Sequence, residues 1–207
     1  MRKSIGLLSL VVLLGLAVAP AANAISISVV PQSPAVGVGG MFSVDVVAAG
    51  LVGGSAPSIG TYDLNVGYDA ALLSLANVTF GTGLDVLGLG SFQDTSASMP
   101  GVANVFELSF DTIAALNSLQ PDAFTLFTLT FNANSIGTSL FGLTINALGD
   151  AAGNPLAADL SNASVTVTPV PLPATPWLLL SGLGVAAVFL RHRKLRVSAQ
   201  AASWTVG

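Results

Sequence analysis

The basic and acidic residues of this 207-residue chain are almost completely separated along the sequence. The six basic residues are Arg2, Lys3, Arg191, Arg193, Lys194 and Arg196, and all ten acidic residues lie between Asp45 and Asp159. The middle of the chain therefore has a formal charge of −10. It has no cationic surface for nucleic acid and no side-chain cation for a phosphate cofactor, so we expect no nucleic-acid partner.

The first 24 residues have the pattern of a secretory signal peptide. Arg2 and Lys3 precede an uncharged apolar run over 5–19, and Ala22 and Ala24 form a small-x-small cleavage site. We predict cleavage after Ala24 and an exported mature protein that begins at Ile25. The chain contains no cysteine, so disulfides and cysteine-bound metals are excluded.

A second apolar run, 177–190, lies near the other end and is followed by basic residues. We predict a transmembrane helix over 176–190, with Thr175 as its N-cap and Pro176 in its first turn. The run 177–190 rises only about 21 Å, against a hydrocarbon core of about 30 Å, so flanking residues must complete the span. The basic cluster predicts that 195–207 is a cytoplasmic tail and that the acidic middle lies outside the cytoplasm.

This C-terminal region resembles the PEP-CTERM sorting signal over 170–194. The resemblance rests on the short motif, the apolar helix with its Ser181–Gly184 segment, and the basic cluster. The sorting-motif residues are Val170, Pro171, Leu172, Pro173, Ala174, Arg191, Arg193 and Lys194. Leu172 stands where the motif's name has Glu, and 195–207 extend beyond the usual end.

The PEP-CTERM resemblance implies processing by exosortase, a membrane-embedded transpeptidase. It implies an inner-membrane precursor with the middle domain outside the cytoplasm, which reaches the cell surface or exterior once the tail is removed. Producers of such proteins typically also make exopolysaccharide.

Residues 25–169 have the size of one domain and alternate mainly with period two, which predicts half-buried strands. The expected inward residues are Ile25, Ile27, Val29, Phe42, Val44, Val46, Tyr62, Leu64, Val66, Tyr68, Phe106, Leu108, Phe110, Phe127, Leu129, Phe131, Phe141, Leu143, Ile145, Val165 and Val167. We therefore predict an all-β sandwich in which the jelly-roll connectivity stays open. A bulge or strand end near Leu126, a short helix within 111–119 and a loop-like stretch over 81–103 are also expected.

The order of these segments resembles a cohesin domain. The resemblance rests on 36–44, on 59–69 with its Tyr68-Asp69-x-x-Leu72 portion, on 72–81, and on 127–131 followed by 137–139. It implies a cohesin-like jelly-roll β-sandwich over 25–169, related to carbohydrate-binding modules. It also implies a binding function, since cohesins of cellulosomes bind dockerins.

Catalysis has few candidate groups in this domain. The only histidine is His192, so 25–169 have no imidazole, thiol, amine or guanidinium to activate a nucleophile or bind zinc. Glu107 and Asp111 share a strand face, but at about 13 Å they are too far apart for a glycosidase pair. We predict that the protein is not an enzyme and needs no cofactor.

Two weaker site predictions remain. Asp150, Asn154 and Asp159 lie in or near a glycine-containing loop and supply oxygen ligands that suit calcium. Phe92 lies in the loop-like stretch and is the candidate ligand contact. The sequence thus favours a non-catalytic surface or extracellular-matrix protein that binds polysaccharide or protein partners. A cohesin-type module with a dockerin-like partner and a carboxylate-based glycan-active enzyme are the alternatives.

Overall fold

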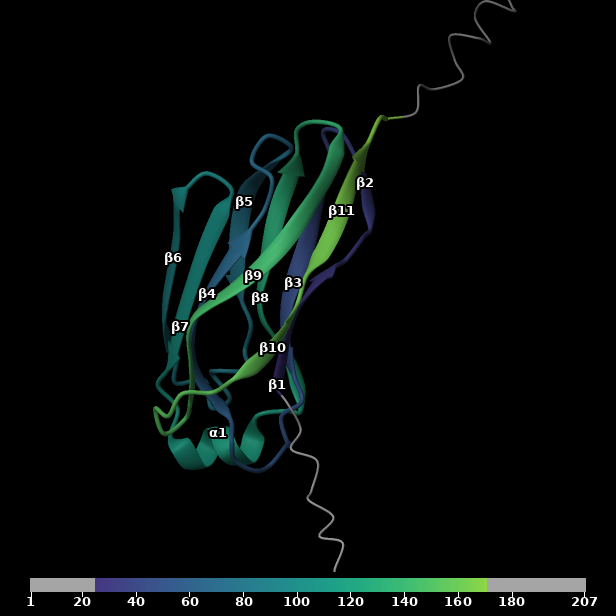
Figure 1. Cartoon of the computed structure of the whole chain (residues 1–207). Helices are drawn as coiled ribbons and strands as arrows, with labels where there is room; N and C mark the ends of the chain where they lie inside the picture. The colour runs from purple at the N-terminus through teal and green to yellow at the C-terminus, as the bar shows by residue number, and fades with distance from the viewer. Residues whose placement is uncertain (1–24, 171–207) are drawn as a thin grey trace, which may run out of the picture. The chain divides into compact units, whose positions relative to one another are not determined.

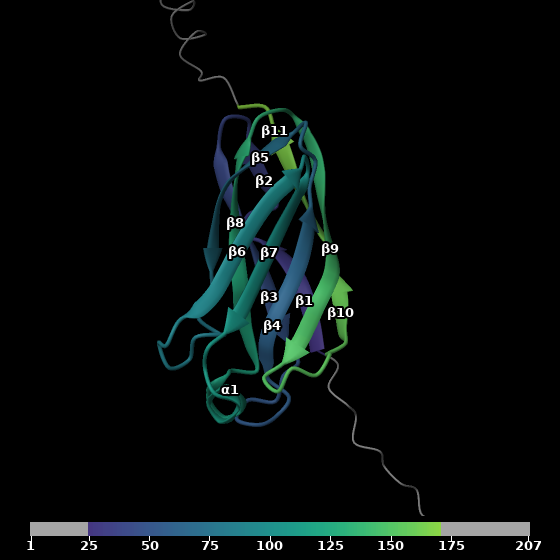
Figure 2. The same ribbon diagram turned by 90° about the vertical axis from the view of Figure 1, so that its left-hand side faces the viewer.

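The computed structural model describes residues 25–170, which form two β-sheets packed face to face with one short helix at one end (Figures 1 and 2). The compact unit that contains the sandwich ends at Val167. The predicted signal peptide with Ala22 and Ala24, the helix over 176–190 and the tail over 195–207 lie outside the described residues. Within 25–170, no helix has the length and apolar character needed to cross a membrane.

Sheet A has five strands in the order β10-β1-β3-β8-β5. The strands are β1 (Ile25–Pro31), β3 (Met41–Ala49), β5 (Leu73–Phe80), β8 (Ala123–Ala133) and β10 (Ala158–Ser161). The pairings are antiparallel except that of β1 with β10, which is parallel.

Sheet B has six strands in the order β2-β11-β9-β4-β7-β6. The strands are β2 (Ala35–Gly37), β4 (Ile59–Gly67), β6 (Ser91–Met99), β7 (Val102–Ser109), β9 (Gly137–Asp150) and β11 (Ala163–Thr168). Figure 2 looks onto the outer side of this sheet, with β6, β7, β4 and β9 side by side. The chain repeatedly switches between the sheets, so most neighbours within a sheet are distant in sequence.

Period-two alternation places one set of side chains between the sheets, as predicted for most strands. The core includes Ile27, Val44, Leu64, Phe127 and Val165, all fully buried. Ring contacts between the sheets include those of Tyr62 with Phe127 and of Tyr68 with Phe131, with centroids 5.7 and 4.9 Å apart. Burial of such rings is a main source of stability in a chain with no disulfide.

The bulge predicted near Leu126 is confirmed. Val46 pairs with Phe127 and Val47 with Thr125, so Leu126 is an extra residue in β8. Both Leu126 and Phe127 are buried, which the bulge permits by breaking the alternation.

The predicted helix is also confirmed, as α1 (Ile113–Leu119). Thr112 rather than Asp111 is its N-cap, and its hydroxyl accepts a hydrogen bond from the Ala115 N–H at 3.2 Å. Only Ala115 and Leu116 are buried. Ile113 and Leu119 are about half exposed.

The inward face predicted for β7 is wrong. Glu107 is 1% exposed, whereas Leu108 and Phe110, predicted inward, are 42% and 57% exposed. The strand continues the phase of Ala103 and Val105, both buried, so its acid enters the core and Phe106 faces outward. The protein tolerates this because hydrogen-bond donors meet the carboxylate.

The loop predicted over 81–103 is wrong for nearly half of its length. Only 81–90 and the turn at 100–101 lie outside strands, and Ser91–Met99 is the edge strand β6. An edge strand pairs with a neighbour along one side only. The polar sequence of β6 shows no alternation of apolar and polar residues, so the sequence pattern does not identify it as a strand. Gly101, with φ +82°, makes the tight turn from β6 into β7.

Candidate functional site

The outer side of sheet B carries aromatic and acidic side chains in a regular arrangement. Phe92 of β6 pairs across the strands with Leu108 of β7, and Asp94 pairs with Phe106. On the other side of β7, Phe106 pairs with Asp63 of β4. Directly paired residues point to the same side of a sheet. We call Asp63, Phe92, Asp94, Phe106 and Leu108 the acid–aromatic face.

The apolar part of the acid–aromatic face is open to solvent. Phe92 is 54% exposed and lies edge-on to the half-buried Phe106, with ring centroids 5.9 Å apart. Exposed aromatic side chains gathered on one sheet are a feature of recognition surfaces rather than of ordinary solvent-facing strands. Phe92, the ligand contact predicted from the sequence, therefore lies on a strand instead of a loop. Its neighbours there are the apolar side chains of Phe106 and Leu108.

Next to the acid–aromatic face, the Asp63 carboxylate and three asparagine amides form a closed ring of hydrogen bonds. Asn104 and Asn146 each donate to Asp63 Oδ1, at 2.5 and 3.0 Å. Asn104 also donates to Asn65 Oδ1 at 3.0 Å, and Asn65 donates to Asn146 Oδ1 at 3.1 Å. Asn146 is the bulged residue of β9, between Ala147 opposite Asp63 and Ile145 opposite Leu64. The bulge places it where it completes the ring.

Glu107, on the opposite side of β7, explains why the aromatic residues face outward. Its Oε2 accepts from the Tyr62 hydroxyl at 2.8 Å, and its Oε1 accepts from Ser91 Oγ at 2.6 Å and from Gln93 Nε2 at 3.1 Å. Burial and the neighbouring Glu107 raise the pKa of Tyr62 well above its ordinary value of 10.0. At 1% exposure Glu107 is closed to a substrate and serves to hold β4, β6 and β7 together.

A loop over 81–90 borders the acid–aromatic face. Asp111 Oδ2 accepts from the backbone N–H groups of Val86 and Leu87, at 2.6 and 3.3 Å. Asp85 Oδ1 accepts from the Gly90 N–H at 2.9 Å. The loop presents Leu87 and Leu89, which are 50% and 60% exposed. Asp85 and Asp111 thus act as structural acceptors that fix an apolar border.

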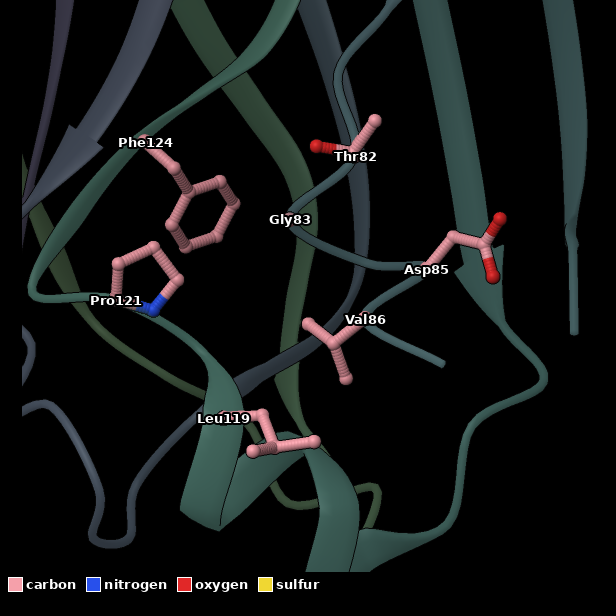
Figure 3. A pocket seen from close by; sticks show the side chains of 7 residues that line it. All are labelled: Thr82, Gly83, Asp85, Val86, Leu119, Pro121 and Phe124. Carbon is pink, nitrogen blue, oxygen red and sulfur yellow. The ribbon is translucent and has the colours of Figure 1, made fainter. Parts of the chain in front are cut away.

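A pocket of about 450 Å³ lies between this loop and the segment after α1 (Figure 3). Val86, Leu119, Pro121 and Phe124 form apolar walls, and Thr82, Gly83 and Asp85 complete the lining. A Cβ on Gly83 would lie 2.0 Å from the Phe124 ring, so only glycine allows the loop to pass this closely. The pocket has a largely apolar lining and one carboxylate, that of Asp85, which already accepts from the Gly90 N–H, but no converging set of polar groups that would orient a substrate.

The predicted calcium ligands are only partly brought together. Asp150 Oδ1 accepts from the N–H groups of Ala152 and Asn154, and its Oδ2 accepts from Asn154 Nδ2 at 3.0 Å. These hydrogen bonds lower the pKa of Asp150, and the bond from the Asn154 side chain has the largest effect. Asp159 lies on β10, opposite Ser26. Within the described residues, no three His, Cys, Asp or Glu side chains form a metal-binding group, and calcium binding stays a prediction.

Four residues of the acid–aromatic face were missed by the sequence analysis as site residues: Asp63, Asp94, Phe106 and Leu108. A signal for Phe106 and Leu108 was present in the alternation of Ala103 and Val105 with Asn104, which sets Phe106 on the outward side. Asp63 and Asp94 flank Phe106 only through pairings between strands distant in sequence, which periodicity alone cannot reveal.

Comparison with known proteins gives one sequence match and a consistent set of structural matches. Residues 169–194 match the PEP-CTERM protein-sorting motif, which indicates an exported protein with a C-terminal membrane-anchoring signal. No curated protein sequence matches the chain.

The structural matches include several cohesins. The sixth cohesin of Acetivibrio cellulolyticus scaffoldin B, solved with a dockerin, has a TM-score of 0.57 at 19% identity, covering 70% of this chain and 99% of that one. A type I cohesin from Clostridium thermocellum, also solved with a dockerin, has a TM-score of 0.56 at 17% identity, covering 70% and 100%. A non-cellulosomal cohesin from the archaeon Archaeoglobus fulgidus has a TM-score of 0.53 at 19% identity, covering 70% and 91%. The chain therefore has a cohesin-like fold and carries a PEP-CTERM motif.

Proposed function

We propose that this chain is a non-catalytic surface protein that exosortase sorts to the cell exterior, where its cohesin-like sandwich recognises a protein partner. The acid–aromatic face is the recognition surface. One observation carries this choice: a half-exposed Phe92 and Leu108 lie together on the outer side of sheet B, where no other element of residues 25–170 covers them, beside polar groups held in a fixed ring. Apolar side chains in this setting gain most when a partner removes them from water.

The contents of the sandwich support a binding rather than a catalytic function. Residues 25–170 contain no histidine, cysteine, lysine or arginine. The deepest carboxylate, Glu107, is 1% exposed and engaged by three donors. The solved cohesins named above include two in complex with dockerins, which supports a protein as the partner.

The sorting step is tested by following the protein in producing cells with and without exosortase. We expect a form that lacks everything beyond about residue 170 outside normal cells, and a full-length membrane form in cells without the enzyme. The mass of the protein in each fraction measures both. A full-length membrane form in both strains would contradict exosortase sorting and leave an ordinary membrane anchor.

The recognition face is tested by capture with the immobilised full-length protein. Partners are retained from the extracellular fraction of the producing cells, and the Phe92→Ser/Leu108→Ser variant is compared with Leu140→Ser/Leu160→Ser. The control pair removes two other exposed leucines, one on each sheet. We expect the first variant alone to lose a protein partner. Equal loss in both variants, or in neither, would exclude this face as the recognition surface.

A polysaccharide is the second candidate ligand, because exposed rings beside a row of amides and a carboxylate also suit sugar recognition. The same capture separates the two candidates. If the retained material is glycan, resists protease and is lost with Phe92→Ser/Leu108→Ser, the face binds polysaccharide instead of protein.

A further inference from the structure

The centre of the acid–aromatic face is an aromatic ring between two carboxylates. Phe106 of β7 pairs with Asp63 on one side and with Asp94 on the other. Directly paired residues have Cβ atoms about 5 Å apart, so each carboxylate lies beside the ring. The face of an aromatic ring attracts cations, and neighbouring carboxylates strengthen that attraction.

The two carboxylates are available to a ligand in different ways. Asp63 Oδ1 is held by Asn104 and Asn146, while its Oδ2 takes part in no hydrogen bond among the described residues. Asp94 is exposed and its side chain makes no hydrogen bond within 25–170. Asp63 is thus fixed in place, and Asp94 is free to turn toward a ligand. Binding therefore costs little side-chain entropy at Asp63.

The charge of the domain determines which ligand fits this row. The ten acidic residues are met by no lysine, arginine or histidine within 25–170, so neither carboxylate has an internal counter-ion. Electrostatic complementarity therefore requires the positive charge to come from the partner. A guanidinium group fits better than an ammonium, because it is planar, stacks on a ring and donates several hydrogen bonds at once.

Building on the proposed recognition function, we propose that the Asp63–Phe106–Asp94 row is a binding site for an arginine side chain of the protein partner. The guanidinium lies over the Phe106 ring and donates to the free oxygens of the two aspartates. Phe92 and Leu108 cover its apolar stem, as arginine stems commonly lie along apolar surface.

The test uses a five-residue peptide, Gly-Ser-Arg-Ser-Gly with blocked ends, and the full-length protein in neutral detergent with only its phenylalanines isotope-labelled. The Phe106→Leu spectrum identifies the Phe106 ring signal among the ten phenylalanines. We expect that signal to shift and saturate at millimolar peptide. The same peptide with citrulline, the neutral isostere of arginine, should bind at least about fivefold more weakly.

A matched pair of variants separates this row from the general negative charge of the domain. Asp94→Asn and Asp159→Asn each remove one exposed carboxylate, but Asp159 lies on β10 of sheet A. We expect Asp94→Asn to weaken arginine-peptide binding about two- to fivefold, the range that exposed ion pairs give, and Asp159→Asn to leave it unchanged. The remaining ring signals report that both variants keep their fold.

Three results would overturn the arginine site. They are equal binding of the arginine and citrulline peptides, equal weakening by Asp94→Asn and Asp159→Asn, and no saturable shift of the Phe106 signal up to about 20 mM peptide. None of these would affect the proposed recognition function, which depends on partner capture lost with Phe92→Ser/Leu108→Ser. Conversely, the capture experiment could retain no partner that depends on Phe92 and Leu108 while the arginine peptide still binds. That outcome would leave an arginine site that serves no stable partner.

Discussion

At the scale of single residues, the pair of Tyr62 and Glu107 controls how the recognition sheet is arranged. The Tyr62 hydroxyl donates to Glu107 Oε2 from a fully buried ring that stacks on Phe127. Residues 25–170 supply no cation to this carboxylate, so within the domain hydrogen bonds alone compensate for its burial. Because the acid occupies the inward position, its neighbours Phe106 and Leu108 are turned to solvent.

Removing the tyrosine hydroxyl alone should cost more stability than removing the whole polar pair. Tyr62→Phe takes one donor from a buried carboxylate oxygen, and we expect a loss of about 1–3 kcal/mol in the free energy of unfolding. Tyr62→Phe/Glu107→Leu removes the carboxylate as well and should recover part of this loss. Urea unfolding of Tyr62→Phe, Glu107→Leu and the double variant measures the coupling free energy between the two side chains. Additive losses would show that the two groups do not depend on each other.

The raised pKa of Tyr62 predicts a loss of stability in alkali. In the unfolded chain this tyrosine releases its proton near its ordinary pKa of 10.0, whereas in the folded protein it keeps the proton to higher pH. The stabilisation is therefore complete below pH 10 and declines as the pH rises above it. The expected slope approaches about 1.4 kcal/mol per pH unit for this one proton. Measuring the free energy of unfolding from pH 8 to 11.5 checks this slope. In Tyr62→Phe the contribution of this one proton to the slope should be absent.

At the scale of elements, the sequence predicted strands well where each inward position is apolar. The phases expected for 25–29, 42–46 and 62–66, the bulge at Leu126 and helix α1 are all confirmed. Prediction was wrong for β7 because an acid takes an inward position there. It missed β6 because an edge strand with polar residues on both sides has no hydrophobic period.

The site was predictable only in part for the same reason. Phe92 was identified from its place in a polar stretch, but its neighbours depend on the register of β6 with β7 and of β7 with β4. Register is decided by long-range pairing and by which face is buried, so a reversed phase in β7 removes Phe106 and Leu108 from the expected surface.

The loop over 81–90 should depend on a single carboxylate. Asp111 accepts from the N–H groups of Val86 and Leu87, so Asp111→Ala leaves both without their acceptor. We expect amide hydrogen exchange at these two residues to become at least about tenfold faster, which corresponds to about 1.4 kcal/mol of local opening free energy. Asp94→Ala, which removes an exposed carboxylate without a hydrogen bond, is the control. Unchanged exchange in Asp111→Ala would show that loop packing alone holds this segment.

At the scale of the whole molecule, the sandwich differs from most folded domains in having charges of one sign only. Residues 25–170 carry ten acidic and no basic side chains, so every long-range charge interaction within the domain is repulsive. Stability must then come from the apolar core and from hydrogen bonds, several of them to carboxylates, rather than from ion pairs. The same one-sided charge is what would direct a cationic partner to the domain.

This charge distribution predicts that salt stabilises the protein. Raising NaCl from about 20 to about 300 mM shortens the screening distance from about 20 to about 6 Å and weakens the repulsion. We expect the Tm of the sandwich to rise by about 2–4 °C, equivalent to about 1 kcal/mol. Asp94→Asn/Asp159→Asn, with two fewer exposed charges, should show a smaller rise in the same thermal scan followed by circular dichroism. A Tm that falls with salt would contradict a net repulsive contribution of the charges to the stability of the sandwich.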